Sequence, residues 1–366
     1  MLLQGIFPPI TTPFYPDGRV YFKKIEHNVE RFSRTPIAGI VILGSTGESV
    51  MLSDEERKEV LKAARAATAP NKVLVAGTGM ESAIETLKLT DYAAELGYDV
   101  ALIRTPHFYR QQMQPANLLA FYRFVADRSP LPVMIYNVPP LTAYDMPADV
   151  IIELAEHSNI IGIKESSGDI EKIRKIVEAT RDIKRSATVT EIFEAVTPRM
   201  LQAAKAESNQ GEELVSVASL SENSSIGSSL SASPSASSSS AVKVTAGIKT
   251  RQKEVGFQLL AGAAQKFDAS LQAGAVGGIL AFATCAPTVC FEVYAARKEG
   301  DSNLATLKQQ RIAKAAQRIA SELGVPAIKY AMDLNGYYGG PARLPLLPPT
   351  AALKLEIEQL MSDIRN

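Results

Sequence analysis

The chain has 366 residues, of which 46% are hydrophobic and 21% are charged, as in ordinary soluble globular proteins. Lys and Arg total 39 and Asp and Glu also total 39, so the formal net charge is zero. This balance gives no long-range field that would attract nucleic acid or an anionic membrane. We therefore expect neither of them as a partner.

The N-terminal residues lack a basic start and a long apolar stretch, and no apolar run in the chain reaches the ~18 residues of a membrane span. We expect a cytoplasmic protein. Cys285 and Cys290 lie five residues apart, so their side chains would point in different directions on a helix, and we expect small buried side chains rather than a disulfide. With three histidines and no HExxH or CxxC pattern, we expect no metal site.

Short apolar runs alternate with helical patterns along the chain, which is typical of βα units around a parallel sheet. The predicted strands are residues 6–12, 39–43, 72–77, 100–105, 132–138, 160–166, 257–261 and 276–282. The predicted helices between them include residues 54–67, 82–96, 115–126, 147–157 and 170–180. Eight such strands favour a (β/α)₈ TIM barrel. The rival is an open doubly wound sheet, but no G-x-G-x-x-G follows the first strand.

Two segments depart from this alternation. Residues 182–254 form a long insertion between the sixth helix and the seventh strand, in which residues 188–206 have helical spacing interrupted by Pro198. Residues 207–241 are rich in serine, so we expect a mobile loop there. A connection from a helix to the next strand lies at the N-terminal face of a barrel, away from an active site. We predict a catalytic barrel over residues 1–287, interrupted by the insertion, and a helical C-terminal extension over residues 288–366.

Three features follow different predicted strands, at the end of a barrel where active sites form. Gly44-Ser-Thr-Gly-Glu48 after the second strand offers hydroxyls and backbone N–H groups that suit a carboxylate, although a structural turn is about as common. Tyr136-Asn-Val-Pro139 places a phenol after the fifth strand, where it could relay protons or simply pack at the rim.

The third feature is Lys164, within Gly162-Ile-Lys-Glu-Ser-Ser-Gly-Asp169 after the sixth strand. Strand alternation points its side chain into an aliphatic cavity, where burial leaves a free amine that can attack a ketone. A lysine at a strand end is, by itself, more often a snorkelling surface residue. Together, the lysine, the phenol and the anion-binding turn describe a site for a 2-oxo acid.

These three motifs, in this order, resemble those of the dihydrodipicolinate synthase / N-acetylneuraminate lyase family. The resemblance covers residues 5–181 and 257–346 and implies that Lys164 forms a Schiff base with pyruvate while Tyr136 relays protons. It also implies that Ser45 and Thr46 hold the pyruvate carboxylate, and that Ser166 and Ile279 line the pocket. It implies no cofactor, and it implies a homo-oligomer, either a dimer or a tetramer.

Two departures from the family pattern bear on the substrate. Dihydrodipicolinate synthases carry an arginine for the aspartate semialdehyde carboxylate two residues after the Pro of the tyrosine motif, where this chain has Leu141. The family's second relay phenol falls at Phe108, so that Tyr109 or His107 would have to replace it.

The tail Gly336-Tyr-Tyr-Gly-Gly-Pro-Ala-Arg-Leu-Pro345 resembles the 4-hydroxy-2-oxoglutarate aldolase branch, although Ser45-Thr46 differs from the Ser-Asn usual there. The resemblance thus implies a lyase that cleaves 4-hydroxy-2-oxoglutarate to pyruvate and glyoxylate. One alternative is a synthase that condenses pyruvate with aspartate semialdehyde, held by another cation such as Arg110. A second alternative is a non-catalytic protein that binds 2-oxo acids.

Overall fold

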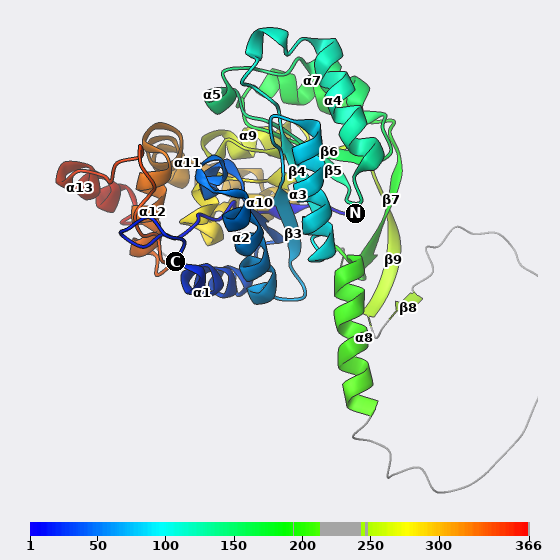
Figure 1. Cartoon of the computed structure of the whole chain (residues 1–366), viewed down its shortest axis with the longest axis horizontal. Coiled ribbons are helices and arrows are strands. Elements are labelled where there is room, and N and C mark those ends of the chain that lie inside the picture. Colours follow the sequence, from blue (N-terminus) through cyan, green and yellow to red (C-terminus); the bar gives the residue numbers. More distant parts are fainter. Residues whose placement is uncertain (193, 213–242, 246–247, 365–366) are drawn as a thin grey trace, which may run out of the picture.

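The computed structural model describes residues 1–192, 194–212, 243–245 and 248–364. Eight parallel strands form the barrel, in the order β1-β11-β10-β6-β5-β4-β3-β2. The barrel closes between β1 and β2, where Ala38 N donates to Ile6 O at 2.9 Å and Val41 N donates to Pro8 O at 3.0 Å. The predicted (β/α)₈ fold is therefore confirmed (Figure 1). The strands are β1 (Gly5–Ile6), β2 (Gly39–Ile42), β3 (Val73–Gly77), β4 (Val100–Arg104), β5 (Val133–Asn137), β6 (Ile160–Glu165), β10 (Gln258–Ala261) and β11 (Gly277–Gly278).

Alternation along the strands divides the apolar core into two parts. On β4, Val100 and Leu102 join a cluster inside the barrel, whereas Ala101 and Ile103 pack toward the surrounding helices. The interior cluster also contains Val73 and Val75 of β3 and Met134 and Tyr136 of β5. Every second side chain of a strand packs inside the barrel, and this packing holds the strands in fixed positions along the barrel axis. The residues that follow the strands therefore also have fixed positions.

The first and last barrel strands are shorter than predicted. We expected strands over residues 6–12 and 276–282, but β1 ends at Ile6 and β11 at Gly278. Pro8 and Pro9 lack the N–H groups that would continue β1. After β11 the backbone turns into a 3₁₀-helix at Ala281–Thr284, which begins the connection to the next helix.

Among the described residues, eight helices surround the sheet, and two of them begin at a side-chain cap. The predicted helix over residues 54–67 is confirmed, with Ser53 Oγ accepting from Glu56 N and Glu56 returning a bond to Ser53 N. Asp169 caps the helix after β6 by accepting from Lys172 N. The helices are α1 (Phe22–Ser33), α2 (Asp54–Ala67), α3 (Ala83–Glu95), α4 (Pro115–Arg128), α6 (Ala148–Ala155), α7 (Ile170–Ala179), α9 (Phe267–Gln272) and α10 (Pro287–Lys298), with the short α5 (Pro139–Thr142) after β5.

The insertion contains a small antiparallel sheet that we did not predict. It comprises β7 (Arg185–Thr190), β8 (Lys243–Thr245) and β9 (Ile248–Val255), in the order β7-β9-β8. A helix over residues 188–206 is the wrong prediction for its first part, since Thr188–Thr190 alternate in burial as a strand does. Helix α8 (Pro198–Glu212) begins at Pro198, because a proline is tolerated in the first turn of a helix. The loop predicted over residues 207–241 lies outside the described residues, apart from the end of α8.

The described part of the insertion covers the N-terminal face of the barrel, as predicted. Arg199 of α8 donates to Pro70 O and Lys72 O and pairs with Asp99, and all three residues precede strands β3 and β4. Arg185 of β7 donates to His157 O, just before β6. Figure 1 shows α8 and the β7–β9 ribbon on the side of the barrel away from α12 and α13.

The C-terminal extension packs beside the opposite end. It comprises α11 (Ser302–Ala315), a π-helical stretch Ala316–Leu323, α12 (Val325–Leu334) and α13 (Ala351–Leu360). The domain division at residue 288 stays a prediction, but α10 contacts β1 and α9 as the eighth barrel helix would, which argues for a boundary after Lys298. Cys285 and Cys290 are both buried and free, as expected. Among the described residues, no helix is long and apolar enough to cross a membrane.

Candidate functional site

A cleft of about 490 Å³ opens at the C-terminal ends of the barrel strands. Its inner wall consists of Ser45, Thr46, Tyr136, Lys164 and Ser166, which follow or end strands β2, β5 and β6. Its outer wall comes from the extension, through residues 320–328 and Leu346. The three sequence motifs therefore meet in one cleft, although the first begins at residue 44 and the third ends at residue 169.

Lys164 and Tyr136 are direct neighbours across the β5–β6 pair. The Lys164 Nζ lies 4.0 Å from the centre of the Tyr136 ring, and the two residues are only 4% and 5% exposed. No carboxylate of the described residues forms an ion pair with Lys164. The amine therefore faces a phenol in a buried part of the cleft, without a carboxylate partner among the described residues.

The turn after β2 brings hydroxyls to this pair. Ser45–Gly47 forms a single 3₁₀ turn, and the Ser45 Oγ lies 3.4 Å from the Tyr136 hydroxyl. Two residues beside the turn, Leu43 and Glu48, have φ values of 60° and 55°, which residues other than glycine rarely adopt. Such conformations persist only where neighbouring contacts hold them, and they cluster at functional sites.

The turn is held by two contacts from the extension and by one from the N-terminal segment. Lys329 of α12 lies 2.6 Å from Glu48 Oε1 in an ion pair whose side chains are 2% and 1% exposed. Burial lowers the pKa of the Lys329 ammonium, and the Glu48 carboxylate opposes that shift. The backbone N–H of Arg343 donates to Glu48 Oε2 at 2.9 Å, and Thr12 Oγ1 donates to Gly47 O at 2.6 Å. The far end of the chain thus fixes the shape of a turn that begins at residue 44.

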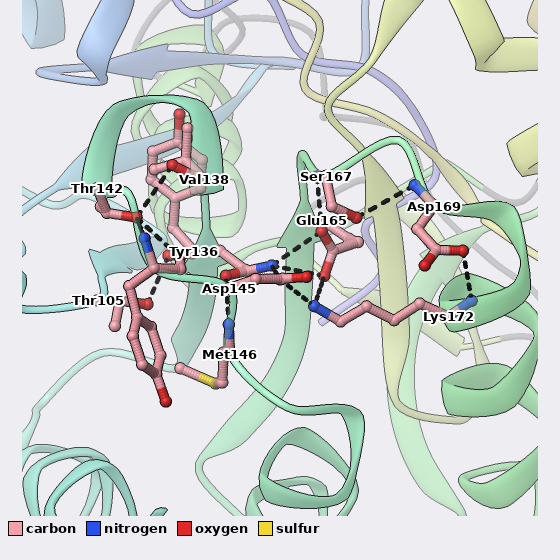
Figure 2. A network of polar contacts seen from close by, with 12 residues as sticks. Thr105, Tyr136, Val138, Thr142, Asp145, Met146, Glu165, Ser167, Asp169 and Lys172 are labelled. Carbon is pink, nitrogen blue, oxygen red and sulfur yellow. Dashed lines mark hydrogen bonds and ion pairs between the residues drawn. The ribbon is translucent and has the colours of Figure 1, made fainter. Parts of the chain in front are cut away.

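A polar network lies on the outer side of the same two strands. Asn137 and Glu165 are the register partners next to Tyr136 and Lys164, and they point away from the barrel interior. Asn137 Nδ2 donates to both Glu165 oxygens at 3.0 Å, and Lys172 Nζ lies 3.2 Å from Glu165 Oε2. Figure 2 shows Lys172 reaching across to Glu165 and Asp145. These contacts tie β5 to β6 at the height of the reactive pair.

The other predicted site residues lie at different depths. Ser166 lines the cleft, its buried Oγ has no partner among the described residues, and a Cβ on Gly262 would come within 1.9 Å of it. Leu141 lines the outer cleft and is 62% exposed. Ile279 is fully buried in the interior cluster with Tyr136 rather than at the cleft surface.

The segment after β4 contains both candidates for the second relay group, but only one of them, His107, lines the cleft. His107 lines the cleft, with its Nδ1 2.8 Å from Glu81 Oε1. Tyr109 is 67% exposed, packs edge-on against Phe108 and is not among the cleft residues of its own chain. A relay through Tyr109 stays a prediction that requires a neighbouring subunit.

Sequence reasoning missed Arg104, the last residue of β4, which lines the cleft beside Tyr136. The alternation of Val100 and Leu102 into the barrel could have revealed it, because the same period points residue 104 inward.

Comparison with known proteins supplies the decisive observation. The model of the dihydrodipicolinate synthetase family matches residues 2–206 and 213–364. The chain belongs to this family.

Curated members of the family align with only part of the chain. A protein of Methanothrix thermoacetophila named 4-hydroxy-tetrahydrodipicolinate synthase is 40% identical over 181 residues, which is 50% of this chain and 60% of that protein. A protein of Methanosarcina barkeri with the same name is 38% identical over 182 residues, or 50% and 61% of the two chains. The aligned region thus spans about three-fifths of these relatives.

Solved structures of family members superpose on the whole chain. A dihydrodipicolinate synthase from Bacillus anthracis has a TM-score of 0.76 at 21% identity and full coverage of both chains. The chloride-inhibited synthase from Acinetobacter baumannii, solved with pyruvate, gives 0.74 at 24% identity and 99% coverage of both. These likenesses establish the shared barrel fold.

Proposed function

We propose that this chain is a class I lyase that forms a Schiff base with pyruvate and related 2-oxo acids through Lys164. The observation that carries the proposal is the contact between the buried Lys164 amine and the Tyr136 ring, beside a turn of hydroxyls and backbone N–H groups. An amine that no carboxylate engages is available to attack a ketone.

In this scheme, Lys164 attacks C2 of pyruvate, and loss of water gives an iminium that withdraws electrons from C3. Removal of a C3 proton gives an enamine, which adds to an aldehyde, and the reverse sequence cleaves the carbon–carbon bond. The Tyr136 hydroxyl relays protons, with Ser45 Oγ as its neighbour at 3.4 Å. Ser45 and Thr46 hold the carboxylate of pyruvate, and the scheme requires neither a metal nor an organic cofactor.

The names of the relatives support aspartate semialdehyde as the aldehyde that condenses with pyruvate. Their names describe 4-hydroxy-tetrahydrodipicolinate synthases, which fits our alternative better than the 4-hydroxy-2-oxoglutarate aldolase predicted from the tail. The observation that favours the aldolase is Leu141, because an apolar side chain stands where a semialdehyde-binding arginine was expected. The aldolase therefore remains the second candidate.

A panel of aldehydes separates these candidates. The purified protein is incubated with pyruvate and either aspartate semialdehyde or glyoxylate, and the condensation products are quantified by mass spectrometry. We expect kcat/KM to be at least tenfold higher for the semialdehyde. A preference for glyoxylate would select the aldolase, and pyruvate binding without any condensation would select a non-catalytic 2-oxo-acid-binding protein.

A homo-oligomer is also part of the proposal. Phe108 and Tyr109 are 76% and 67% exposed, and together they form an apolar surface that a second copy could cover. Light scattering should give a mass of two or four times 39.4 kDa, and a monomer would contradict this part of the proposal.

A further inference from the structure

Arg104 places a positive charge in the inner layer of the barrel. Its neighbours Val100 and Leu102 fill the barrel interior, and the period of the strand turns Arg104 to the same side. The register pairs Arg104 with Tyr136, and Tyr136 with Lys164, so the three residues occupy one level on adjacent strands. Arg104 also lines the same cleft as Lys164.

The guanidinium of Arg104 is poorly satisfied where it lies. Its side chain is 13% exposed, and the single partner among the described residues is Glu81 Oε1, at 3.3 Å from an Nη. Its Nε is buried and has no hydrogen-bond acceptor in the described part of the chain. A guanidinium carries five N–H donors, and buried donors without partners are uncommon in folded proteins.

Glu81 is already occupied by other donors. Its Oε2 accepts from the backbone N–H groups of His107 and Phe108 at 2.8 and 3.0 Å, and its Oε1 lies 2.8 Å from the His107 ring. Burial raises the pKa of the Glu81 carboxyl, but the backbone N–H groups of Phe108 and His107 and the side chains of His107 and Arg104 outweigh it, so the pKa is lowered. The carboxylate therefore serves chiefly to hold the segment after β4 and leaves most of the Arg104 donors free.

The other charges around the cleft leave room for an anion. Lys329 neutralises Glu48, the acidic residue among the cleft-lining side chains of the described chain. Leu141 supplies no charge at the outer wall. Arg110, the cation suggested by the sequence, is exposed and is not among the cleft residues. Arg104 is thus the guanidinium that lines the cleft.

We propose that Arg104 binds the carboxylate of the aldehyde partner, so that this enzyme selects acidic aldehydes through β4 rather than through residue 141. The inference rests on the proposed function of the same cleft. A guanidinium matches a carboxylate with two parallel N–H···O bonds, which a lysine or a neutral side chain does not reproduce. The substrate class is therefore an aldehyde that carries a carboxylate.

The experiment uses succinate, a four-carbon dicarboxylate that cannot condense, as a probe of the acidic subsite. Its dissociation constant is measured by calorimetry for the full chain, with and without saturating pyruvate, in the wild type and in Arg104→Met, Arg104→Lys and Arg110→Met. Borohydride trapping of the pyruvate adduct is run on the same samples, and circular dichroism compares their folding.

We expect Arg104→Met to weaken succinate binding at least tenfold, Arg104→Lys to restore part of it, and Arg110→Met to change it less than twofold. The trapped pyruvate adduct should stay within twofold in all three variants. The inference is overturned if wild-type protein does not bind succinate at millimolar concentration, or if Arg104→Met leaves its affinity unchanged. Loss of the pyruvate adduct in Arg104→Met would also overturn it, because Arg104 would then hold pyruvate.

Absence of a pyruvate adduct in the wild type would refute the proposed function by itself. The succinate titration without pyruvate would still decide the role of Arg104. If Arg104→Met does not fold, Arg104→Lys is compared with the wild type instead. A folded Arg104→Lys that binds succinate as tightly as the wild type would contradict a bidentate site.

Discussion

Arg343 joins three segments that are distant in the sequence. Its guanidinium donates to Gly18 O and Met51 O and forms an ion pair with both oxygens of Glu56. The hydrogen bonds from Arg343 lower the pKa of the Glu56 carboxyl below its ordinary value of 4.5, against the opposing effect of burial. Because the pKa is lower in the folded state, the ion pair contributes fully above about pH 4.5 and is lost as the pH falls through the folded value.

Glu56→Gln should therefore lower the free energy of unfolding by about 1 kcal/mol at pH 7, while a Gln still completes the helix cap. The difference from wild type should shrink as the pH falls below about 4.5. Urea unfolding at pH 7 and pH 4 measures it. Glu59→Gln, on the exposed face of the same helix, is the control for charge alone. A difference that is equal at both pH values would show that the ion pair does not act in this way.

At the residue scale, the sequence was sufficient to identify site residues that belong to a recognisable strand end or turn. Lys164 and Tyr136 could be paired because each follows an apolar strand, and Ser45 belongs to a recognisable turn. Arg104 escaped notice because its meaning depends on register with β5 and on the shortage of acceptors around it. The Lys329–Glu48 pair could not be foreseen either, since 281 residues separate its members and only the packing of α12 joins them.

Helix α7 carries two lysines, and comparing their substitutions tests the polar network around Glu165. Lys172 is 9% exposed and serves the buried Glu165, whereas Lys175 pairs with Asp149 at the surface, where the two side chains are 56% and 81% exposed. Breaking a buried pair leaves an uncompensated charge, which costs much more than a surface pair.

Lys172→Met should lower the free energy of unfolding by about 3 kcal/mol, and Lys175→Met by at most ~0.5 kcal/mol. Denaturant melts of both variants and the wild type, at one pH and salt concentration, provide the comparison. Equal losses in the two variants would contradict the view that Glu165 depends on Lys172.

At the element scale, the apolar period of the sequence predicted five helices, over residues 54–67, 82–96, 115–126, 147–157 and 170–180, to within two residues at each end. The helix over residues 54–67 starts at a capping box and is such a case. The strand β7 was missed because Thr188 and Val189 lie just before Ile192 and Val196, whose spacing in the sequence is helical. The segment is a strand rather than a helix because it pairs with β9, which lies more than 50 residues away in the chain.

At the scale of the whole molecule, the two additions to the barrel differ in their relation to the cleft. The described part of the insertion covers the N-terminal face through Arg199 and Arg185, whereas the C-terminal extension forms the outer wall of the cleft and clamps the turn at Glu48. Figure 1 shows these two parts on opposite sides of the barrel. The position of the insertion could be predicted from the order of helix and strand alone, but the contribution of the extension to the cleft needed three-dimensional packing.

The central claim is that Lys164 forms the imine, and borohydride trapping tests it most directly. The protein is reduced in the presence of pyruvate, digested and analysed by mass spectrometry, with Lys164→Ala as the variant and Lys175→Ala as the control. We expect one adduct per chain on the peptide that contains Lys164 in the wild type and in Lys175→Ala, and none in Lys164→Ala. An adduct that persists in Lys164→Ala, or a wild-type protein that traps no pyruvate, would contradict the account.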